Sequence, residues 1–196
     1  MTLTYTVDEL IAITRKYAAF INGVTVSGGE STLQLPFLID YFKAIKAAPD
    51  LRHLTCLIDS NGTLSLNGWQ KIAPFMDGAM IDLKSWSEET HIYLTGRSNQ
   101  RIKKSIKWLS EHNLLAELRL LYIPEKTDYL ENIEPLSQFI NSLDESIPIR
   151  INAFHQHGVY GEAKNWRSAN KEQIINLQNE LILRKVNLIK IPNIYT

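Results

Sequence analysis

The chain has 196 residues, 44% of them apolar, and its 21 basic and 21 acidic side chains leave a formal net charge of zero. This length and apolar content suit one well-cored domain. The longest basic stretch, Arg101 to Lys107, has the spacing of a solvated helix face, and the neutral balance lacks the basic excess typical of nucleic-acid binding. No apolar run approaches the roughly 18 residues of a membrane span. We therefore expect neither nucleic-acid nor membrane partners.

The N-terminus and the cysteine content favour a cytoplasmic protein. Residues Met1 to Thr6 lack the basic start and apolar core of a secretion signal. Cys56 is the only cysteine, so no intrachain disulfide can form, which fits a reducing compartment.

Helical and strand patterns alternate along the chain. The spacing of Thr6 and Glu9 is typical of a capping box, and the helix it opens is expected to run to about Ala19. Its predicted buried face carries Leu10, Ile11, Ile13 and Tyr17. A strand at 24–27 follows, and Pro36 suits the first turn of the next helix, which we expect to end near Ala47.

The later elements continue this alternation. They are a strand at 54–59, a short helix at 69–75 capped by Asn67, a strand at 79–83, helices at 88–94 and 98–112, a strand at 115–123, a helix at 130–142, a strand at 147–154, a helix capped by Asn170 and ending near 184, and a strand at 188–191. Apolar strands alternating with helices predict an α/β fold with a parallel sheet, in one domain over residues 1–196. The longest irregular stretch, Gln156 to Ser168, is interpreted as either a lid or docking loop, or an ordinary surface loop.

Polar residues gather where the predicted strands end. They are Gly28, Gly29 and Glu30 after the first strand, Asp59, Ser60 and Asn61 at the second, Asp82 and Lys84 at the third, Arg119 in the fourth, and His155 and His157 after the fifth. In parallel β/α folds ligands bind at this end of the sheet. Five successive strands contributing to one rim therefore favour a ligand site there.

Each of these groups also has a purely structural interpretation. The Gly28-Gly29 pair is common in turns and lacks the third glycine of a dinucleotide-binding fingerprint. Glu30 could cap the following helix, and Asp59–Gly62 could be an Asx-type turn. Lys84 near Asp82 could be a surface ion pair worth under roughly 1 kcal/mol.

Metal chelation and nucleophilic catalysis receive little support. His155 and His157 alternate along a strand end, so they should point to opposite faces and should not bind one metal together. Cys56 in a buried strand is interpreted as a small apolar residue. No Ser-His-Asp arrangement has a supporting local motif such as a nucleophile elbow.

Five short motifs, in this order, resemble pyruvate formate-lyase activating enzymes. They are Gly23–Glu30 (GVTVSGGE), Asp59–Gly62 (DSNG), Met80–Lys84 (MIDLK), Gly96–Asn99 (GRSN) and Phe154-His155. These enzymes are radical S-adenosylmethionine (SAM) proteins that install a glycyl radical on a partner enzyme. The resemblance covers most of the chain and is weakest after His157. It implies a partial (β/α)6 TIM-like barrel of the radical SAM type.

The resemblance also implies roles for the rim residues. Gly28, Gly29 and Glu30 match the motif at the methionyl amino group, where glycines allow close approach and a carboxylate holds the amine. The residues matching SAM-binding positions are Gly28, Gly29, Glu30, Asp59, Asp82, Leu83, Lys84 and His155, with Lys84 paired to an anionic group and His155 at the nucleoside. Those matching a monovalent cation site are Asp59, Ser60, Met80 and Asp82. Arg119 could assist from the fourth strand.

The resemblance further implies a four-iron, four-sulfur cluster, a pyruvate formate-lyase-like glycyl radical enzyme as partner, and an electron donor such as flavodoxin or ferredoxin. The family binds its cluster through a CxxxCxxC loop, which this sequence lacks, so the chain has no iron-sulfur ligands and no catalytic residue to assign. We expect a C-terminal piece of such an enzyme that lacks the first β/α unit, exposes the strand at Val24 as an edge, and binds SAM weakly or not at all without cleaving it.

Two smaller departures and two alternatives remain. Ser60 replaces the threonine more usual before Asn-Gly, and Ile123-Pro124-Glu125 lacks the glycine that often follows proline there. The alternatives are a non-catalytic α/β docking or scaffold domain, and an α/β-barrel enzyme acting on a phosphorylated sugar. A CxxxCxxC motif encoded upstream would favour the activating enzyme over the docking domain.

Overall fold

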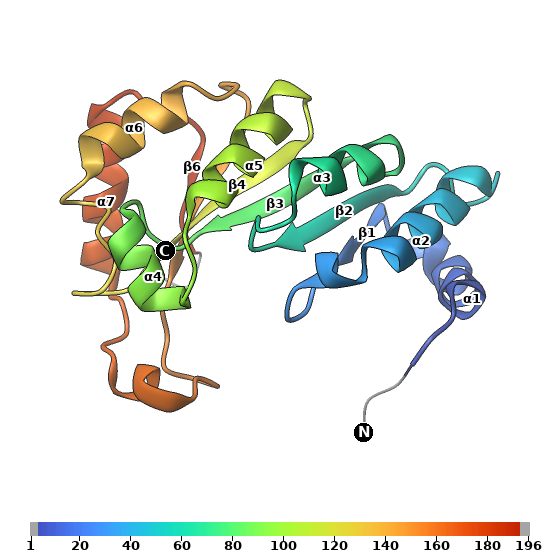
Figure 1. Ribbon diagram of the computed structural model, residues 1–196, viewed down its shortest axis with the longest axis horizontal. Coiled ribbons are helices and arrows are strands. Elements are labelled where there is room, and N and C mark those ends of the chain that lie inside the picture. The colour runs from blue at the N-terminus through green and yellow to red at the C-terminus, as the bar shows by residue number, and fades with distance from the viewer. Residues whose placement is uncertain (1–3, 193–196) are drawn as a thin grey trace.

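The structure, a computed structural model, describes residues 4–192 and consists of one parallel sheet with helices packed on it (Figure 1). The strands are β1 (Gly23–Val26), β2 (Thr55–Ser60), β3 (Gly78–Leu83), β4 (Leu115–Tyr122), β5 (Ile149–Ala153) and β6 (Ile189–Lys190). Their spatial order is the chain order, β1 to β6, and every neighbouring pair is parallel. This is the strand order of a TIM-like barrel, and the sheet is not closed, so the predicted α/β partial barrel is confirmed.

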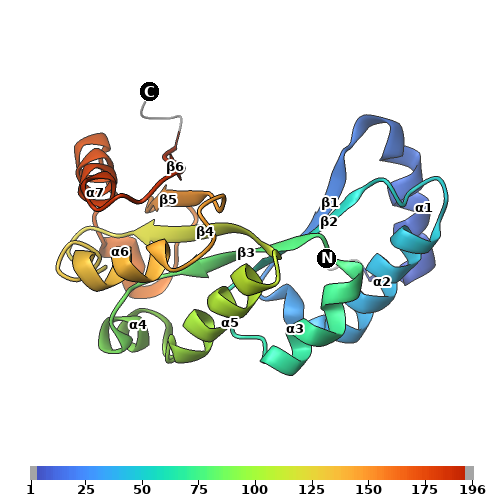
Figure 2. The same ribbon diagram turned by 90° about the horizontal axis from the view of Figure 1, so that it is seen from above.

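Helices precede and connect these strands. They are α1 (Val7–Tyr17), α2 (Leu35–Ala47), α3 (Leu66–Ile72), α4 (Glu88–Thr95), α5 (Gln100–Glu111), α6 (Ile133–Asn141) and α7 (Lys171–Leu183), with short 3₁₀ turns η1 (Ala18–Phe20), η2 (Ser31–Gln34), η3 (Ala73–Phe75) and η4 (Gly161–Asn165). Helix α1 and the turn η1 precede the first strand, and the later helices lie in the crossover connections between strands. Figure 2 shows α2, α3 and α5 together on one side of the sheet. Parallel strands require such crossovers, and each crossover covers the sheet with its apolar face.

The core lies between the sheet and these helices. Fully buried side chains include Phe42 of α2, Trp69 of α3, Ile81 of β3 and Leu118 of β4. The indole of Trp69 donates to the hydroxyl of Ser105 on α5 at 3.0 Å, so the large buried ring has a polar partner. The core therefore holds the central strands firmly from the helical side and leaves their carboxyl ends accessible.

Helix α1 differs from the sequence expectation. Its capping box between Thr6 and Glu9 is present, but Ile13 and Tyr17, which were predicted to be buried, are 40% and 49% exposed. The buried residue of this helix is Thr14, whose hydroxyl lies 2.7 Å from the hydroxyl of Tyr41 on α2. Leu10 and Ile11 of the predicted face are partly buried and pack against the core, whereas Ile13 and Tyr17 face solvent.

Two other local predictions were wrong. The cap of α3 is Ser65, which accepts from the backbone of Gly68, and Asn67 lies inside the helix. The Gln156–Ser168 segment is not entirely irregular, because it contains η4. Both errors concern short elements, where one turn of helix leaves little periodicity to recognise.

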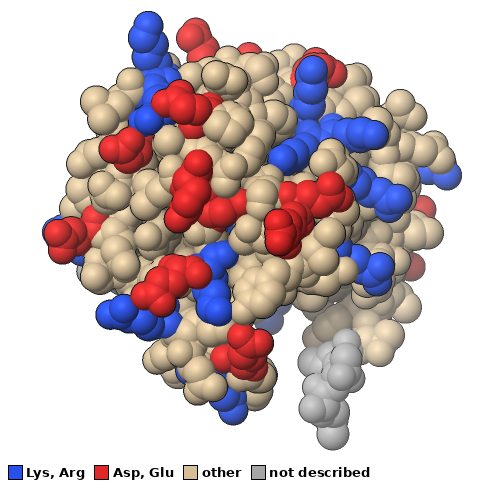
Figure 3. All heavy atoms as spheres, turned by 60° about the vertical axis from the view of Figure 1, so that its left-hand side comes forward, with Lys and Arg blue, Asp and Glu red and all other residues tan. Residues whose placement is uncertain are grey.

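Charged side chains of both signs are interspersed on the face that Figure 3 shows. That face therefore carries no large patch of one sign. Among the described residues, no helix has both the length and the apolar character needed to cross a bilayer.

Candidate functional site

A polar hollow of about 240 Å³ lies at the carboxyl ends of β1 to β5. Its lining residues are Ser27, Gly28, Gly29, Glu30, Asp59, Ser60, Asn61, Asp82, Lys84, Arg119 and Asn152. The parallel sheet brings these groups together because all of them except Arg119, which is the fifth residue of β4, lie near or just beyond the end of a strand. The hollow thus contains most of the rim residues that the sequence singled out.

The glycine pair shapes one wall of this hollow. Gly28 and Gly29 have φ angles of 110° and 36°, a region that side-chain-bearing residues rarely adopt. A Cβ built on either glycine would meet no atom within 4 Å. The backbone conformation therefore requires glycine, and the space beside the two residues is open to a ligand.

The carboxylate of Glu30 joins the first two strand ends. Its Oε1 accepts from the backbone N–H of Thr32 at 3.1 Å, from the Thr32 hydroxyl, and from the hydroxyl of Ser60 at 2.8 Å. Its Oε2 accepts from the backbone N–H of Asn61 at 2.8 Å. The structural interpretation, that Glu30 caps the helical turn that follows it, is confirmed, because Glu30 is the N-cap of η2. The remaining acceptor capacity lies on Oε2, since each carboxylate oxygen has about two lone-pair directions.

An ion-pair network forms the floor of the hollow. Asp59 accepts from Arg119 at 3.0 Å and from Ser27 at 3.2 Å. Arg119 and Arg150 both donate to the same oxygen of Glu117, at 2.8 and 3.0 Å. The network therefore crosses from the loop after β1, through β2 and β4, to β5.

Burial and ion pairing act in opposite directions on this network. Burial by itself would raise the pKa of Glu117, but the hydrogen bonds from Arg150 and Arg119 outweigh it and hold that pKa below its ordinary value. Burial would lower the pKa of Arg119, and Glu117 and Asp59 together raise it instead. Glu117 and Arg119 are therefore both charged at neutral pH.

Sequence reasoning missed Glu117 and Arg150, as well as the lining residues Ser27 and Asn152. Glu117 and Arg119 are two residues apart on one strand, so their side chains share a face. Arg119 is also directly opposite Arg150 in the register of β4 and β5. The alternation of side chains along β4 indicates that Glu117 and Arg119 share a face of the sheet. Only the register between β4 and β5 shows that Arg150 lies close enough to pair with Glu117.

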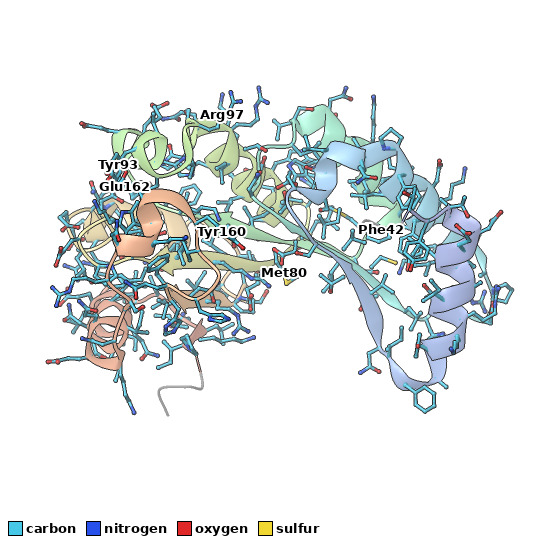
Figure 4. The ribbon with its side chains drawn as sticks, turned by 90° about the horizontal axis from the view of Figure 1, so that it is seen from below. Phe42, Met80, Tyr93, Arg97, Tyr160 and Glu162 are labelled. Carbon is cyan, nitrogen blue, oxygen red and sulfur yellow. The ribbon has the colours of Figure 1, made fainter. Side chains whose placement is uncertain are left out.

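The remaining predicted residues lie around this centre. Lys84 pairs with Asp82 at 3.3 Å. The sulfur of Met80 is 2.9 Å from a guanidinium nitrogen of Arg119, and Figure 4 shows Met80 near the middle of the sheet. The side chain of Leu83 is fully buried, so a ligand in the hollow could reach this residue only through its backbone.

The histidines are placed further out. His155 and His157 are both exposed beyond β5, and neither lines the polar hollow. The fifth strand therefore contributes Asn152 to the hollow, and the two predicted histidines beyond it do not line it.

A departure from the family pattern has a visible backbone consequence. Glu125, which stands where a glycine often follows proline, has a φ of 62°. This is the left-handed region, which costs a residue with a Cβ free energy that glycine avoids. Glycine would therefore adopt this backbone conformation at a lower cost than Glu125 does.

The donor groups present do not fit an iron-sulfur cluster. Cys56 is buried within β2, and burial raises the pKa of its thiol to about 11. Over residues 4–192, no group of three or more His, Cys, Asp and Glu side chains is placed to hold a metal ion. A four-iron cluster needs several thiolates, which one buried thiol does not supply.

Comparison with known proteins gives the family. The sequence matches the profile of the Radical SAM superfamily over residues 3–139. The chain belongs to the radical SAM superfamily. It is 35% identical over 164 residues to the pyruvate formate-lyase-activating enzyme of Staphylococcus epidermidis and 32% identical over 164 residues to that of Staphylococcus aureus strain USA300. Both alignments cover 79% of this chain, which spans 64% of the length of each relative.

Solved structures show the same radical SAM fold. A domain of the pyruvate-formate lyase-activating enzyme from Bacteroides vulgatus ATCC 8482 superimposes with a TM-score of 0.72 at 21% identity, covering 88% of this chain and 99% of that domain. Streptococcus suis SuiB bound to S-adenosylmethionine gives a TM-score of 0.69 at 15% identity, covering 97% of this chain and 44% of SuiB. At these identities the likeness concerns the fold alone.

Proposed function

We propose that this chain forms the SAM-binding rim of a glycyl-radical enzyme activase. The observation that carries the proposal is the polar hollow, in which acidic and basic side chains from successive strand ends surround a glycine loop with open space beside it. SAM carries a cationic amine, a carboxylate and a sulfonium, so a site of mixed charge suits it.

The amine end of SAM is assigned to the glycine loop. Oε2 of Glu30 retains acceptor capacity, and the backbone of Gly28 and Gly29 can approach a ligand without a Cβ in between. A charge-assisted hydrogen bond from the amine to Glu30 would add to the contacts that already hold this carboxylate.

The carboxylate end is assigned to the side of the hollow that carries Lys84. A monovalent cation beside it would take oxygen ligands from Asp59, Ser60 and Asp82, with Met80 contributing through its backbone carbonyl. Asp59 already pairs with Arg119, so a bound cation would compete with that guanidinium. His155 is assigned to the nucleoside, and Leu83 contributes through its backbone.

The activity proposed for the whole protein goes beyond this chain. It is the transfer of a hydrogen atom from a glycine Cα of a pyruvate formate-lyase-like partner to a 5′-deoxyadenosyl radical derived from SAM, with flavodoxin or ferredoxin as electron donor. The residues of this chain do not fit a four-iron cluster, and no step through a cluster follows from them. For the chain alone we propose weak SAM binding without cleavage.

Nuclear magnetic resonance of the 22.5-kDa chain tests the binding proposal. Titration with SAM to about 10 mM should shift the amide signals of Gly28, Gly29 and Asn61, with a dissociation constant of about 1 mM or weaker. Asp82→Asn should weaken the shifts severalfold, because it alters the hollow. Asp40→Asn makes the same charge change on the exposed surface of α2 and should leave them unaltered.

Two results would count against this proposal. Rim signals that do not move at the highest SAM concentration would favour the docking-domain alternative. Micromolar binding measured by calorimetry without iron would contradict the expectation that the cluster supplies the main contacts.

A further inference from the structure

Charged side chains extend beyond the polar hollow along the inner face of the sheet, the face opposite the helix-covered core. Along β5 the side chains of Ile149 and Ile151 are buried in that core. Arg150 and Asn152 alternate with them and therefore project from the inner face. Glu117 of β4 lies on this face too, since Arg150 donates to it. The interior of a barrel of this type is ordinarily filled by branched apolar side chains, so charged residues here are unusual.

Arg150 has hydrogen-bonding capacity that the described residues do not use. Its Nε donates to Oε1 of Glu117 at 3.0 Å, and its two terminal nitrogens have no acceptor among the described residues. Arg119 differs, because all three of its guanidinium nitrogens have a partner. The Arg150 side chain is 37% exposed, so the N–H groups of both terminal nitrogens are available to a ligand.

A second cation lies beside Arg150 on the same face. Lys190 of β6 is directly opposite Arg150 in the strand register, so the two side chains project in the same direction. Lys190 is exposed and has no ion-pair partner in the described part of the chain. It therefore adds a positive charge to a network in which two arginines are already balanced by two carboxylates.

Asn152, the next inner-face residue of β5, is suited to a peptide backbone. Its side chain lines the polar hollow and makes no hydrogen bond to the described residues. A primary amide offers both donors and an acceptor, which match the C=O and N–H of an extended chain. Asn152 is two residues from Arg150, about 7 Å along the strand, which is also the spacing of alternate residues in an extended peptide. One extended segment on this face can therefore reach both side chains.

We propose that Arg150 and Lys190 bind the carboxylate of an acidic residue in the partner polypeptide, with Asn152 on the backbone of the same segment. A planar guanidinium matches a carboxylate with two parallel N–H···O bonds, and Glu117 holds it in place before the ligand arrives. The identity of the polypeptide rests on the proposed function, because an activase acts on a partner protein. A segment with a basic residue at this position would meet two like charges, so the pair selects among partners.

Nuclear magnetic resonance with short peptides tests this subsite in the absence of SAM. The peptide acetyl-Gly-Asp-Gly-amide has neutral ends and one carboxylate. It should shift the Nε–Hε signal of Arg150 with a dissociation constant of about 1–10 mM. Acetyl-Gly-Asn-Gly-amide has the same shape without the charge and should bind about fivefold more weakly or worse.

Substitutions separate binding from stability. Arg150→Gln and Lys190→Gln should each weaken the acidic peptide about three- to tenfold and reduce its advantage over the neutral peptide. Arg150→Lys keeps the charge without the planar fork and should recover only part of the affinity. Because Lys190 is exposed, Lys190→Gln tests the subsite even if Arg150→Gln does not fold. Arg52→Gln removes an exposed arginine that lies before β2 and should leave peptide binding unchanged.

Several outcomes would overturn the proposal. Wild type that binds neither peptide, or both equally, would show that the two cations do not select a carboxylate. An Arg150→Gln chain that loses stability and keeps the wild-type preference for the acidic peptide would reduce Arg150 to a structural partner of Glu117.

Two further titrations distinguish other sources of the anion. Inorganic phosphate that shifts the Arg150 signal while the acidic peptide does not would assign the cations to a free anion. An Arg150 signal that moves with SAM and not with the peptide would assign them to the cofactor. Because the peptide titration contains no SAM, a chain that fails to bind SAM can still bind the acidic peptide, and the two failures are distinguishable.

Discussion

Single side chains in this protein connect strand ends that are far apart in the sequence. Glu30 is the clearest case, because its carboxylate accepts hydrogen bonds from Thr32, Ser60 and the backbone of Asn61. A residue that the motif assigns to ligand binding therefore also holds the walls of the hollow. Its substitution should change the free protein as well as any complex.

Glu30→Ala should lower the free energy of unfolding by about 1–3 kcal/mol, because it leaves several donors without their acceptor. Hydrogen exchange at the amide of Asn61 should accelerate with it. Glu30→Gln keeps one carbonyl acceptor and should show a smaller loss in chemical denaturation. If the amide of Asn61 exchanges at the same rate in wild type and in Glu30→Ala, then Glu30 does not hold that amide in place.

Glu117→Gln should destabilise the protein in a pH-dependent way. The folded pKa of Glu117 lies below the ordinary 4.5, so its stabilisation is fully present above pH 4.5 and is lost as the pH falls through the folded value. At pH 7 the variant should lose about 2–3 kcal/mol, because two arginines lose their shared partner. The difference from wild type should shrink below pH 4.5.

Urea denaturation between about pH 3 and pH 7 measures this difference. Glu111→Gln makes the same change on an exposed acid of α5 and should give nearly no difference at any pH. A loss for Glu117→Gln that stays constant over the whole range would mean that the charge of Glu117 is not responsible.

Glu125→Gly should stabilise the protein by about 0.5–1 kcal/mol. The φ of 62° at this residue strains a side-chain-bearing backbone, and glycine relieves that strain. The exposed ion pair with Arg167 that would be lost contributes little. Glu125→Ala removes the same ion pair but keeps a Cβ, so thermal unfolding should place it at or below wild type, with Glu125→Gly above both.

The residues of the site could be predicted only in part from the sequence. The glycines and acids at strand ends were found because they interrupt apolar runs at recognisable positions. Glu117 and Arg150 were missed because their meeting depends on the register between β4 and β5, which no local pattern specifies. The part of the site that local chain conformation determines was therefore accessible, and the part that depends on tertiary pairing was not.

At the scale of elements, the Gln156–Ser168 segment is attached to α4 by one cluster. The Tyr93 hydroxyl donates to Glu162 at 3.1 Å and accepts from Lys126 at 2.9 Å, and the Trp166 indole donates to Glu162 at 3.3 Å. Figure 4 shows Tyr93 and Glu162 side by side where the segment meets α4. The ammonium of Lys126 also lies 5.4 Å from the Trp166 ring centre.

Tyr93→Phe should loosen this segment without unfolding the protein. It removes a hydroxyl that joins Lys126 to Glu162, and the segment should open about three to ten times more often. Limited trypsin cleavage after Lys164 and Arg167 measures the opening. Tyr160→Phe removes a hydroxyl from an exposed ring of the same segment and should leave the cleavage rate unchanged. Equal rates for both variants would show that the cluster does not hold the segment.

The order and type of the elements were predictable where apolar periodicity extends over several turns or a whole strand. All six strands were expected close to their observed positions. The face of α1 was predicted only in part. Leu10 and Ile11 pack against the core, but burial of Ile13 and Tyr17 would require a neighbour on their side of the helix. Amphipathicity shows which face can be buried, and the tertiary partner decides which face is buried.

For the whole molecule, an open parallel sheet implies a gradient of stability from its centre to its two edges. The central strands β3 and β4 each pair on both sides, whereas β1 and β6 pair on one side within the described residues. Ile81 of β3 is fully buried, and Ile189 of β6 is only partly buried. Local opening should therefore be rarest in the centre and most frequent at the edges.

The same substitution at the centre and at the edge tests this gradient. Ile81→Ala should cost about 3 kcal/mol, since the cavity it leaves in a close-packed core cannot fully collapse. The thermal midpoint should fall by about 6–12 °C in a chain of this size. Ile189→Ala should cost about 1 kcal/mol or less, because the edge can relax around the smaller side chain and water already reaches it. Equal losses for the two variants would mean that the sheet unfolds as a uniform unit, with β6 as firmly integrated as β3.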